Sequence, residues 1–487
     1  MSTLITRLPV LFLSFCILIA PAAAATPEIN QQGADKLQAL FENIIQNRKN
    51  KALPQNMQYD FDGDVTVELA DTYYAVTLPY ITIKNFGEYN LKIGMIAINV
   101  TPHETPGRWN MAIALPPQFH VTSADDTVMA SINIGAQAMT GIWDETLHYM
   151  GAIKAAYNNI TVTNRNNLTT MRLDEIVIRT DGLERSTPLL FSGIVNIELK
   201  NLETINLEGQ IVKLDSTTMN ARIEGLQGFW SQQTPAANTT TAAPPSLPSF
   251  LTSPPKELEA SYNIAGFSIF DEQEKKEVFA VDNLNLILTG KELQSDAAAL
   301  DLDLNYNGMK SDDILNKLAI KDLNLAVVVT KIPMLQLIAM QENSAQSEGN
   351  GLSLMFKVPS VLAQTGTIIK VENSKTVGPD YNGAINAEII GDITAVNAMT
   401  VRGGVRIKGL DQFIERMRSY SELIAGMLDT IKPLANNTDP QDGSSPVSRF
   451  TFIMDKTGKI LVNDQDITKP KAPPPTPTPS TNTESAR

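Results

Sequence analysis

A chain of 487 residues is too long for one ordinary domain, since domains usually hold about 100 to 200 residues, so we expect two or three. Apolar residues make up 43% of the chain, which is enough for packed cores. The formal net charge of −14 opposes binding to phosphate backbones and to anionic membrane surfaces, so we expect no nucleic-acid partner.

The first residues, 1–25, have the pattern of an export signal. Arg7 precedes an apolar run, and small residues follow it. Because Ala23 and Ala25 occupy the positions that signal peptidase reads, we predict cleavage after Ala25 and a mature chain that begins at Thr26. We therefore expect a periplasmic protein with no transmembrane span after cleavage, because the apolar run is shorter than the ~20 residues that cross a bilayer. The alternative is an uncleaved anchor.

The first part of the mature chain, 26–230, begins with a short helix and continues as strands. From residue 64 onwards polar and apolar residues alternate, as in antiparallel strands with one buried face. We therefore predict a β-rich lobe. The helix is indicated by apolar residues at helical spacing, Leu37, Leu40, Phe41, Ile44 and Ile45. The strand-like runs are 64–69, 75–78, 80–83, 91–93, 111–115, 131–134, 194–199 and 205–208.

Two proline-rich segments interrupt and end the chain. Residues 231–256 are rich in Pro, Thr and Ala, a composition that buries too little apolar surface to offset its ordering entropy. We predict a linker there. Over 468–487 the prolines predict a disordered tail.

A second β-rich lobe is predicted over 257–467. Alternation resumes in the runs 260–264, 284–288, 300–304 and 323–329. Asp312 and Pro333 stand where helices often begin, and a C-terminal helix is predicted over 411–432, where apolar residues recur on one face until Pro433. The lobe closes with a hairpin whose turn contains Gly458.

An eight-residue phrase occurs twice in the chain. It reads RIEGLQGF at 222–229 and RIKGLDQF at 406–413, each time after a strand-like run. This repetition suggests two related halves that each close with a strand, a glycine turn and a re-entry. Convergence of two strand–turn sequences is the alternative.

Residues that usually carry catalysis are sparse. His103, His120 and His148 lie on separate strand-like runs, whereas a zinc site usually has paired ligands at close spacing. The single cysteine, Cys16, lies in the signal segment, so neither disulfides nor thiol catalysis is expected in the mature chain. The sequence contains no nucleophile elbow, phosphate-binding loop or HExxH motif. We expect no enzyme activity, catalytic residue, metal or cofactor.

Two acidic segments partly match known kinds of site. Residues 303–308 alternate oxygen ligands as a calcium loop does, but Ile314 stands where a bidentate glutamate is required, which favours a strand and a turn. Asp60, Asp62 and Asp64 form a denser cluster. A polar turn is the main interpretation of this cluster, and the carboxylates of a hydrolase are the alternative.

The three tryptophans, Trp109, Trp143 and Trp230, are far apart in the sequence. This spacing favours core or edge positions in a sheet over a carbohydrate-stacking platform.

Amphipathic strands outnumber helices in this chain. A sheet with one apolar face must cover that face with helices, with another sheet or with something that is not protein. Sheet packed on sheet is one solution, and an apolar groove for acyl chains is the other.

The chain resembles the AsmA-like β-repeat proteins and uncharacterised two-lobed bacterial periplasmic families. The resemblance is carried by the export signal, the short helix after it, the runs 284–288 (LNLIL) and 300–304 (LDLDL) followed by Asn307-Gly308, and the closing segment 456–463 (KTGKILVN). It implies a β-rich periplasmic protein that handles lipids or assists envelope assembly. AsmA-like proteins usually keep an N-terminal anchor, whereas Ala23 and Ala25 here favour release.

We therefore predict an α+β protein with two β-rich lobes of mainly antiparallel, amphipathic strands and a few covering helices. The leading functional hypothesis is a non-enzymatic periplasmic protein that binds lipid or another apolar envelope component in a β-sheet groove. One alternative is an envelope assembly or structural factor that works through contacts with envelope proteins. The other is a carboxylate-dependent envelope hydrolase.

Overall fold

The computed structural model describes residues 29–49, 57–86, 88–145, 149–187, 190–206, 208–227, 254–311, 320–345, 351–438 and 446–468. Several sequence-based predictions lie outside these ranges. They are the cleavage site with Ala23, Ala25 and Thr26, the helix start near Asp312, nearly all of the linker 231–256, and the tail from residue 469.

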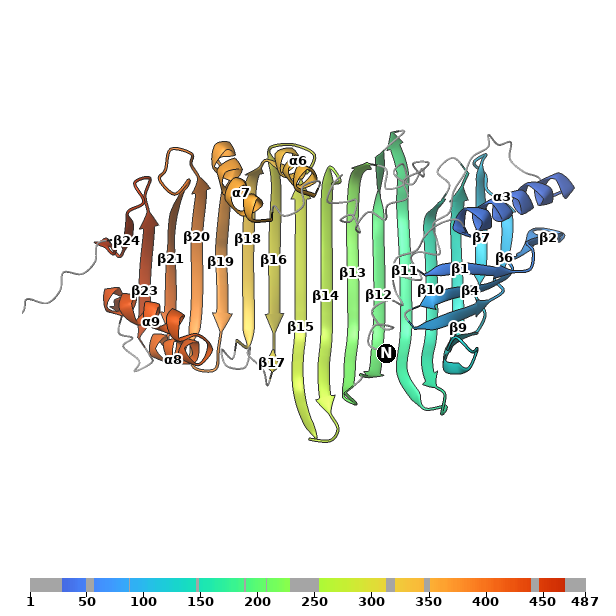
Figure 1. The fold of residues 1–487 in the computed structure, drawn as a ribbon, viewed down its shortest axis with the longest axis horizontal. Helices are drawn as coiled ribbons and strands as arrows, with labels where there is room; N and C mark the ends of the chain where they lie inside the picture. Colours follow the sequence, from blue (N-terminus) through green and yellow to red (C-terminus); the bar gives the residue numbers. More distant parts are fainter. Residues whose placement is uncertain are drawn as a thin grey trace, which may run out of the picture.

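The strands belong to one antiparallel sheet (Figure 1). From β9 onwards each long strand pairs with the next one along the chain, so this part is an up-and-down meander. Its strands are β9 (Val128–Asp144), β10 (Tyr149–Asn164), β11 (Thr169–Thr187), β12 (Leu190–Ile205), β13 (Ile211–Gln227), β14 (Glu257–Asp271), β15 (Lys276–Lys291), β16 (Ala298–Asn307), β17 (Lys310–Ser311), β18 (Asp322–Ile332), β19 (Ile368–Val377), β20 (Asn382–Gly391), β21 (Met399–Lys408), β22 (Asn436–Thr438), β23 (Val447–Met454), β24 (Ile460–Val462) and β25 (Gln465–Asp466).

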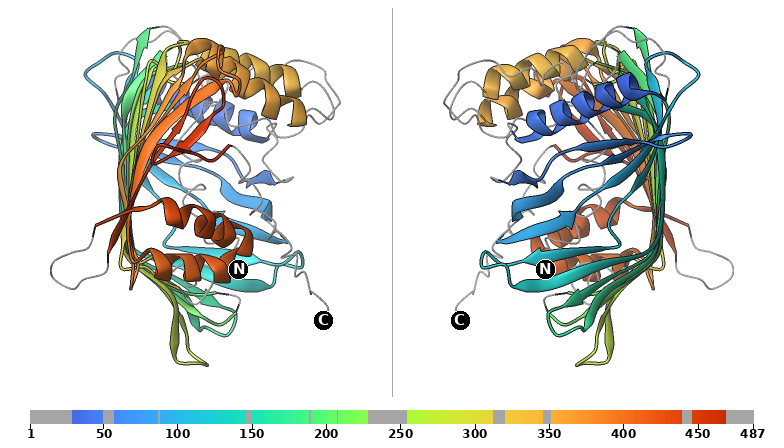
Figure 2. Two further views of the ribbon diagram at one scale, coloured as in Figure 1. Left: turned by 90° about the vertical axis from the view of Figure 1, so that its left-hand side faces the viewer. Right: turned by 90° about the vertical axis from the view of Figure 1, so that its right-hand side faces the viewer.

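The helices all lie on one side of this sheet, which we call the inner face (Figure 2). Helix α3 crosses the N-terminal end of the sheet. We use edge for a row of strand ends: α6 and α7 lie along one edge, and α8 and α9 lie at the opposite edge near the C-terminal end of the sheet. Their bounds are α3 (Gln31–Lys49), α6 (Met334–Ala345), α7 (Gly351–Thr365), α8 (Leu410–Tyr420) and α9 (Glu422–Ile431), followed by the 3-10 turn η3 (Lys432–Leu434). The predicted α+β class, with mainly antiparallel strands and few helices, is confirmed.

The main packed core lies at the N-terminal end of the inner face. There the shorter strands fold against β9–β11 and α3 covers them, so that Leu37, Tyr74 and Trp109 are fully buried. These strands are β1 (Gln58–Asp62), β2 (Thr66–Leu69), β3 (Tyr74–Thr77), β4 (Tyr80–Phe86), β5 (Tyr89–Gly94), β6 (Ala97–Pro102), β7 (Arg108–Ala114) and β8 (Gln118–Thr122).

The predicted N-terminal helix is present as α3, and a buried carboxylate fastens it. Leu37, Phe41, Ile44 and Ile45 point into the core, as their spacing predicted. Glu145, whose side chain is 8% exposed, pairs with Lys36 of α3 at 2.9 Å. The indole nitrogen of Trp109 donates to the same carboxylate at 2.7 Å. The carboxylate of Glu145 can be buried because the ammonium group of Lys36 and the indole N–H of Trp109 both bind it.

The two predicted β-rich lobes are parts of one continuous sheet. Strand β13 precedes the predicted linker and β14 follows it, yet the two strands pair from Ile211 opposite Phe270 to Glu224 opposite Glu257. The described end of the linker is also held, since Lys256 donates its backbone N–H to Glu224 at 2.8 Å. The proline-rich segment 231–256 therefore does not interrupt the strand pairing of the sheet.

The predicted helix over 411–432 is present as two helices. Ser421 adopts an extended conformation between α8 and α9 and caps α9 by accepting a hydrogen bond from the backbone N–H of Ile424. The helix expected to begin at Pro333 is present as α6, and the closing hairpin is present as β23 and β24. Helix α7, which contains Pro359, was not predicted.

The two copies of the repeated phrase lie at opposite edges of the sheet. Strands β13 and β21 run in opposite directions, so the first copy ends at the edge near α6 and the second at the edge near α8 (Figure 1). The first copy stays in a strand as far as Gln227, whereas the second enters α8 after Gly409. The copies share a left-handed glycine, Gly225 and Gly409, and the residues that follow Gln227 in the first copy lie outside the described ranges.

Candidate functional site

The inner face carries an uninterrupted apolar row that crosses the sheet from β12 to β24. In an antiparallel sheet, residues directly opposite each other point to the same side. One chain of opposed residues on this side holds only Val, Ala, Leu, Gly and Phe. In order across the strands its members are Val195, Ala221, Ala260, Leu288, Leu302, Val327, Val371, Ala387, Gly403, Phe452 and Val462.

A second inner row runs parallel to the first, two residues along each strand. It is also apolar throughout, and it passes under helix α6, where Leu258, Leu300 and Val329 contact Met334 and Leu337. Its members are Gly193, Ile223, Leu258, Gly290, Leu300, Val329, Ile369, Ile389, Val401, Met454 and Ile460.

A third row lies between these two rows. Its side chains are on the other side of the sheet and are mostly polar. Glu388 belongs to this row, within 3.9 Å of Lys370 and in an ion pair with Arg402. The members of this outer row are Ile194, Arg222, Glu259, Thr289, Asp301, Val328, Lys370, Glu388, Arg402, Ile453 and Leu461. Along these rows the inner side of the sheet is apolar and the outer side is mostly polar, as in an antiparallel sheet with one buried and one solvated face.

Within the described residues, protein covers the inner face mainly towards its ends and edges. The N-terminal core covers β9–β11, α6 covers the short cluster around Leu293, and α8 and α9 pack on Ile407 and Phe450. Between these clusters Leu286, Leu288, Leu302 and Leu304 are only half-buried and belong to no buried cluster. We call this stretch, on β13–β16, the open inner face.

The open inner face is part of a wider apolar side of the sheet. Neighbouring strands lie about 4.8 Å apart, so its four strands, β13–β16, span roughly 15 Å of a meander that extends for roughly 45 Å from β12 to β23. Met219 and Tyr262 expose 43% and 39% of their surface on it. Contiguous apolar patches of this extent on proteins usually mark binding sites for apolar ligands, membranes or protein partners.

The edge of the inner face beneath α8 is closed by aromatic and paired charged groups. Tyr381 is buried, and its ring lies 5.0 Å from that of Phe413. Arg416 donates two hydrogen bonds of 2.9 Å to Asp380, and this contact lowers the pKa of the carboxyl group. Burial raises the pKa of both Tyr306 and Tyr381, so these phenols stay neutral at physiological pH.

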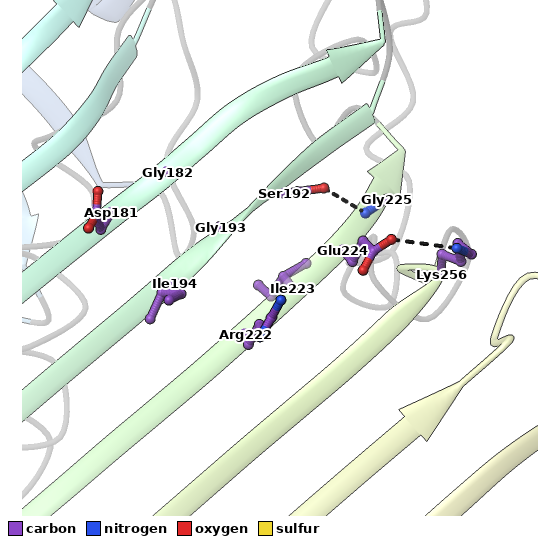
Figure 3. Close-up of a pocket in the computed structure, with 10 residues that line it drawn as sticks. All are labelled: Asp181, Gly182, Ser192, Gly193, Ile194, Arg222, Ile223, Glu224, Gly225 and Lys256. Carbon is purple, nitrogen blue, oxygen red and sulfur yellow. Dashed lines mark hydrogen bonds and ion pairs between the residues drawn. The ribbon is translucent and has the colours of Figure 1, made fainter.

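A polar cavity of about 670 Å³ lies at the opposite edge, next to the first copy of the repeated phrase (Figure 3). Gly225 donates its backbone N–H to Ser192 Oγ at 3.1 Å, and Lys256 Nζ lies 3.5 Å from Glu224. Asp181 and Arg222 add one charge of each sign to the lining. The described residues that line the cavity therefore carry balanced charges, and they include neither a histidine nor paired carboxylates that suit acid–base chemistry.

The acidic cluster near Asp60 is not gathered into one site. Asp60 lies on β1 opposite Thr82, is half-exposed and pairs with Lys84 at 2.8 Å. Asp62 ends β1, and Asp64 follows the turn at Gly63. The calcium-like segment 303–308 is the end of β16 and the turn after it, as the alternating leucines indicated, and Ile314 lies outside the described residues.

The histidines and tryptophans occupy structural positions where they are described. His103 accepts a hydrogen bond from the backbone of Thr105, and His120 Nδ1 lies 3.1 Å from Ser131 Oγ. Trp109 and Trp143, distant in sequence, are opposite each other on β7 and β9 and are buried, so their predicted core placement is confirmed. His148 and Trp230 lie outside the described residues.

No three His, Cys, Asp or Glu side chains gather as metal ligands within the described ranges. The helices described here are also too short or too polar for any of them to cross a bilayer.

Sequence reasoning anticipated the amphipathic strands but missed the extent of the shared face. The runs at 284–288 and 300–304 predicted an apolar side, whereas β10, β11, β19 and β20 were not identified individually. Alternation is also visible in 217–223 and 385–389, which could have extended the prediction. Comparisons of the chain with protein-family models, curated proteins and solved structures found no match.

Proposed function

We propose that this protein binds the acyl chains of lipids along its open inner face, as a non-enzymatic protein of the periplasm. The observation that carries the proposal is the apolar row from Val195 to Val462, which no polar side chain interrupts. Covering apolar surface contributes about 25 cal/mol per Å², so an apolar occupant would gain free energy over the whole stretch.

Acyl chains suit this face better than a compact ligand. The face is a long strip bordered by helices at its edges rather than a closed pocket (Figures 1 and 2). One leaflet's acyl chains extend for about half of the ~30 Å hydrocarbon core of a bilayer, which is similar to the roughly 15 Å that the four strands of the open inner face span. The neutral phenols of Tyr306 and Tyr381 add no charge to the apolar surface.

The test is native mass spectrometry of protein purified without detergent, repeated after organic extraction. We expect an extractable mass of lipid size on the wild-type protein. The variant Leu286→Gln/Leu304→Gln, whose two positions are opposite each other on the open inner face, should lose most of that lipid. The control Ile287→Gln/Val328→Gln makes the same kind of change on the outer side of β15 and β18 and should keep it.

Two results would contradict the proposal. One is a wild-type protein that carries no lipid and takes up no fluorescent fatty acid. The other is a bound polypeptide in place of lipid, which would favour the assembly-factor hypothesis instead.

A further inference from the structure

Helix α9 presents a solvent-exposed apolar ridge that the lipid-binding proposal does not use. We define the α9 ridge as Leu423, Ile424 and Met427, which expose 76%, 38% and 64% of their surface. Tyr420, the last residue of α8, adjoins it and is 50% exposed. Positions 423, 424 and 427 share one side of a helix, so these side chains form one strip.

The opposite side of α9 is fastened to the sheet. Ala425 is fully buried, and Leu428 and Ile431 pack on the cluster that contains Ile407 and Phe450. The ridge is therefore held in place by a packed core rather than by local helix propensity. An exposed strip of large apolar side chains on a well-anchored helix is a feature of surfaces that meet an apolar partner.

The charges around the ridge decide which partner is suitable. Arg418 pairs with Glu422 at 2.8 Å and with Asp429 at 2.6 Å. Arg416 pairs with Asp380, and Lys432 pairs with Asp411. Each cation of 410–434 is thus engaged by an acid of the same protein, so helices α8 and α9 and the turn η3 offer no free cation to anionic headgroups. The chain as a whole carries a net charge of −14, which repels an anionic surface.

The size of the ridge argues against a protein partner or a second copy of the chain. A helix of 10 residues is about 15 Å long, so a strip about 10 Å wide covers on the order of 150 Å². Stable protein interfaces bury about 800 Å² on each partner. A lipid bilayer accepts a small apolar ridge because its headgroup region conforms to what is inserted, and tyrosine suits that depth.

We propose that the α9 ridge inserts into the surface of an electroneutral, zwitterionic phospholipid bilayer and docks the protein there. This inference concerns a second surface and stands apart from lipid binding on the open inner face. It differs from electrostatic docking, which the acidic composition opposes.

The test is flotation of the purified full chain with phosphatidylcholine vesicles, and in parallel with vesicles that contain phosphatidylglycerol. We expect the wild-type protein to float with phosphatidylcholine, independently of salt, and less with the anionic vesicles. The variant Leu423→Glu/Met427→Glu should bind about tenfold more weakly or worse, since moving one large apolar side chain out of water changes a partition constant by about that factor. Both positions are exposed, so the variant should keep the wild-type Tm.

The control is Gln412→Glu/Asn436→Asp, which adds the same two charges at exposed positions of the same region, away from the ridge. It should float as the wild type does. Equal flotation of the ridge variant and the wild type, binding only to anionic vesicles, or no flotation at all would each overturn the inference. Lipid measured by mass spectrometry on the same protein preparations before vesicles are added reports separately on the open inner face, so failure of either proposal is distinguishable.

Discussion

Met219 of β13 lies directly opposite Tyr262 of β14 on the open inner face. The two strands precede and follow the predicted linker 231–256, so this pair joins the two parts of the chain that the composition separates. Both side chains are also among the exposed large apolar residues. The sheet is therefore continuous at the same place where the described residues leave an apolar surface uncovered.

The first prediction concerns this continuity. After cleavage at a specific protease site inserted into the linker, the two fragments should stay together as one particle, because β13 and β14 share a ladder from Ile211 to Glu224. Size-exclusion chromatography should give the elution volume of the uncut protein, and thermal unfolding should remain a single transition. Separation of the fragments without denaturant would show that the parts fold and dissociate as independent lobes.

A second prediction compares a covered residue with an uncovered one. Leu37 is fully buried under α3, so Leu37→Ala should lower the free energy of unfolding by about 2–5 kcal/mol. Leu288 is half-buried on the open inner face, so Leu288→Ala in lipid-free protein should cost about 1 kcal/mol or less. Urea denaturation of extracted protein measures both values.

The same pair of variants tests whether lipid covers the face. When lipid is restored, Leu288→Ala should become more costly, while the cost of Leu37→Ala should stay unchanged, because only the first site contacts the ligand. Equal costs for Leu288→Ala in both states would mean that the ligand does not reach that side chain.

How far the fold follows from the sequence depends on the range of the interactions. The 3.6-residue spacing around Leu37 and Phe41 is local, and it correctly predicts α3. The two-residue alternation at 300–304 likewise predicts β16. The helix over 411–432 was predicted as one element because its apolar spacing does not reveal that Ser421 turns the chain and caps a new helix.

Pairing between distant strands is the part that the sequence could not supply. A proline-rich composition at 231–256 indicates where ordering is costly, but it says nothing about whether the flanking strands meet. Trp109 and Trp143 show the same limit, since no local pattern in the sequence places the two indoles opposite each other on β7 and β9. The apolar groove was predicted from the excess of strands over helices, but its extent depends on the register of the whole meander.

The third prediction concerns pH. Lys456 and Thr394 hydrogen-bond to Asp392 and lower its pKa from 3.8 to about 2, with Lys456 the larger cause. Because the pKa is lower in the folded state than in the unfolded state, the contribution of Asp392 to stability is complete above about pH 4 and is lost as the pH falls to about 2. The wild type should therefore have a higher Tm than Asp392→Asn at pH 6, and the difference should vanish near pH 2.

The contact between Asp392 and Lys456 ties the turn after β20 to the turn after β23, so the effect should be local as well as pH-dependent. Hydrogen exchange of the Val396 amide, which donates to the carbonyl of Lys456, should speed up in Asp392→Asn at pH 6. Lys456→Gln should reproduce this change. A difference in Tm that persisted at pH 2 would point to a cause other than the charge of Asp392.

The last prediction uses the glycine of the second repeated phrase. Gly409 has φ of 74° at the start of α8, and a Cβ there would lie 2.3 Å from the backbone oxygen of Asp380. Gly409→Ala should therefore destabilise the protein by about 1–3 kcal/mol from backbone strain, with the steric contact adding to it.

Gly426 is the control, because it lies inside α9 and a Cβ there would meet nothing within 4 Å. Gly426→Ala should stabilise the protein by about 0.5–1 kcal/mol, since alanine is the better helix former. Denaturant unfolding measures both effects, and equal signs for the two substitutions would refute the assignment of a left-handed turn to Gly409.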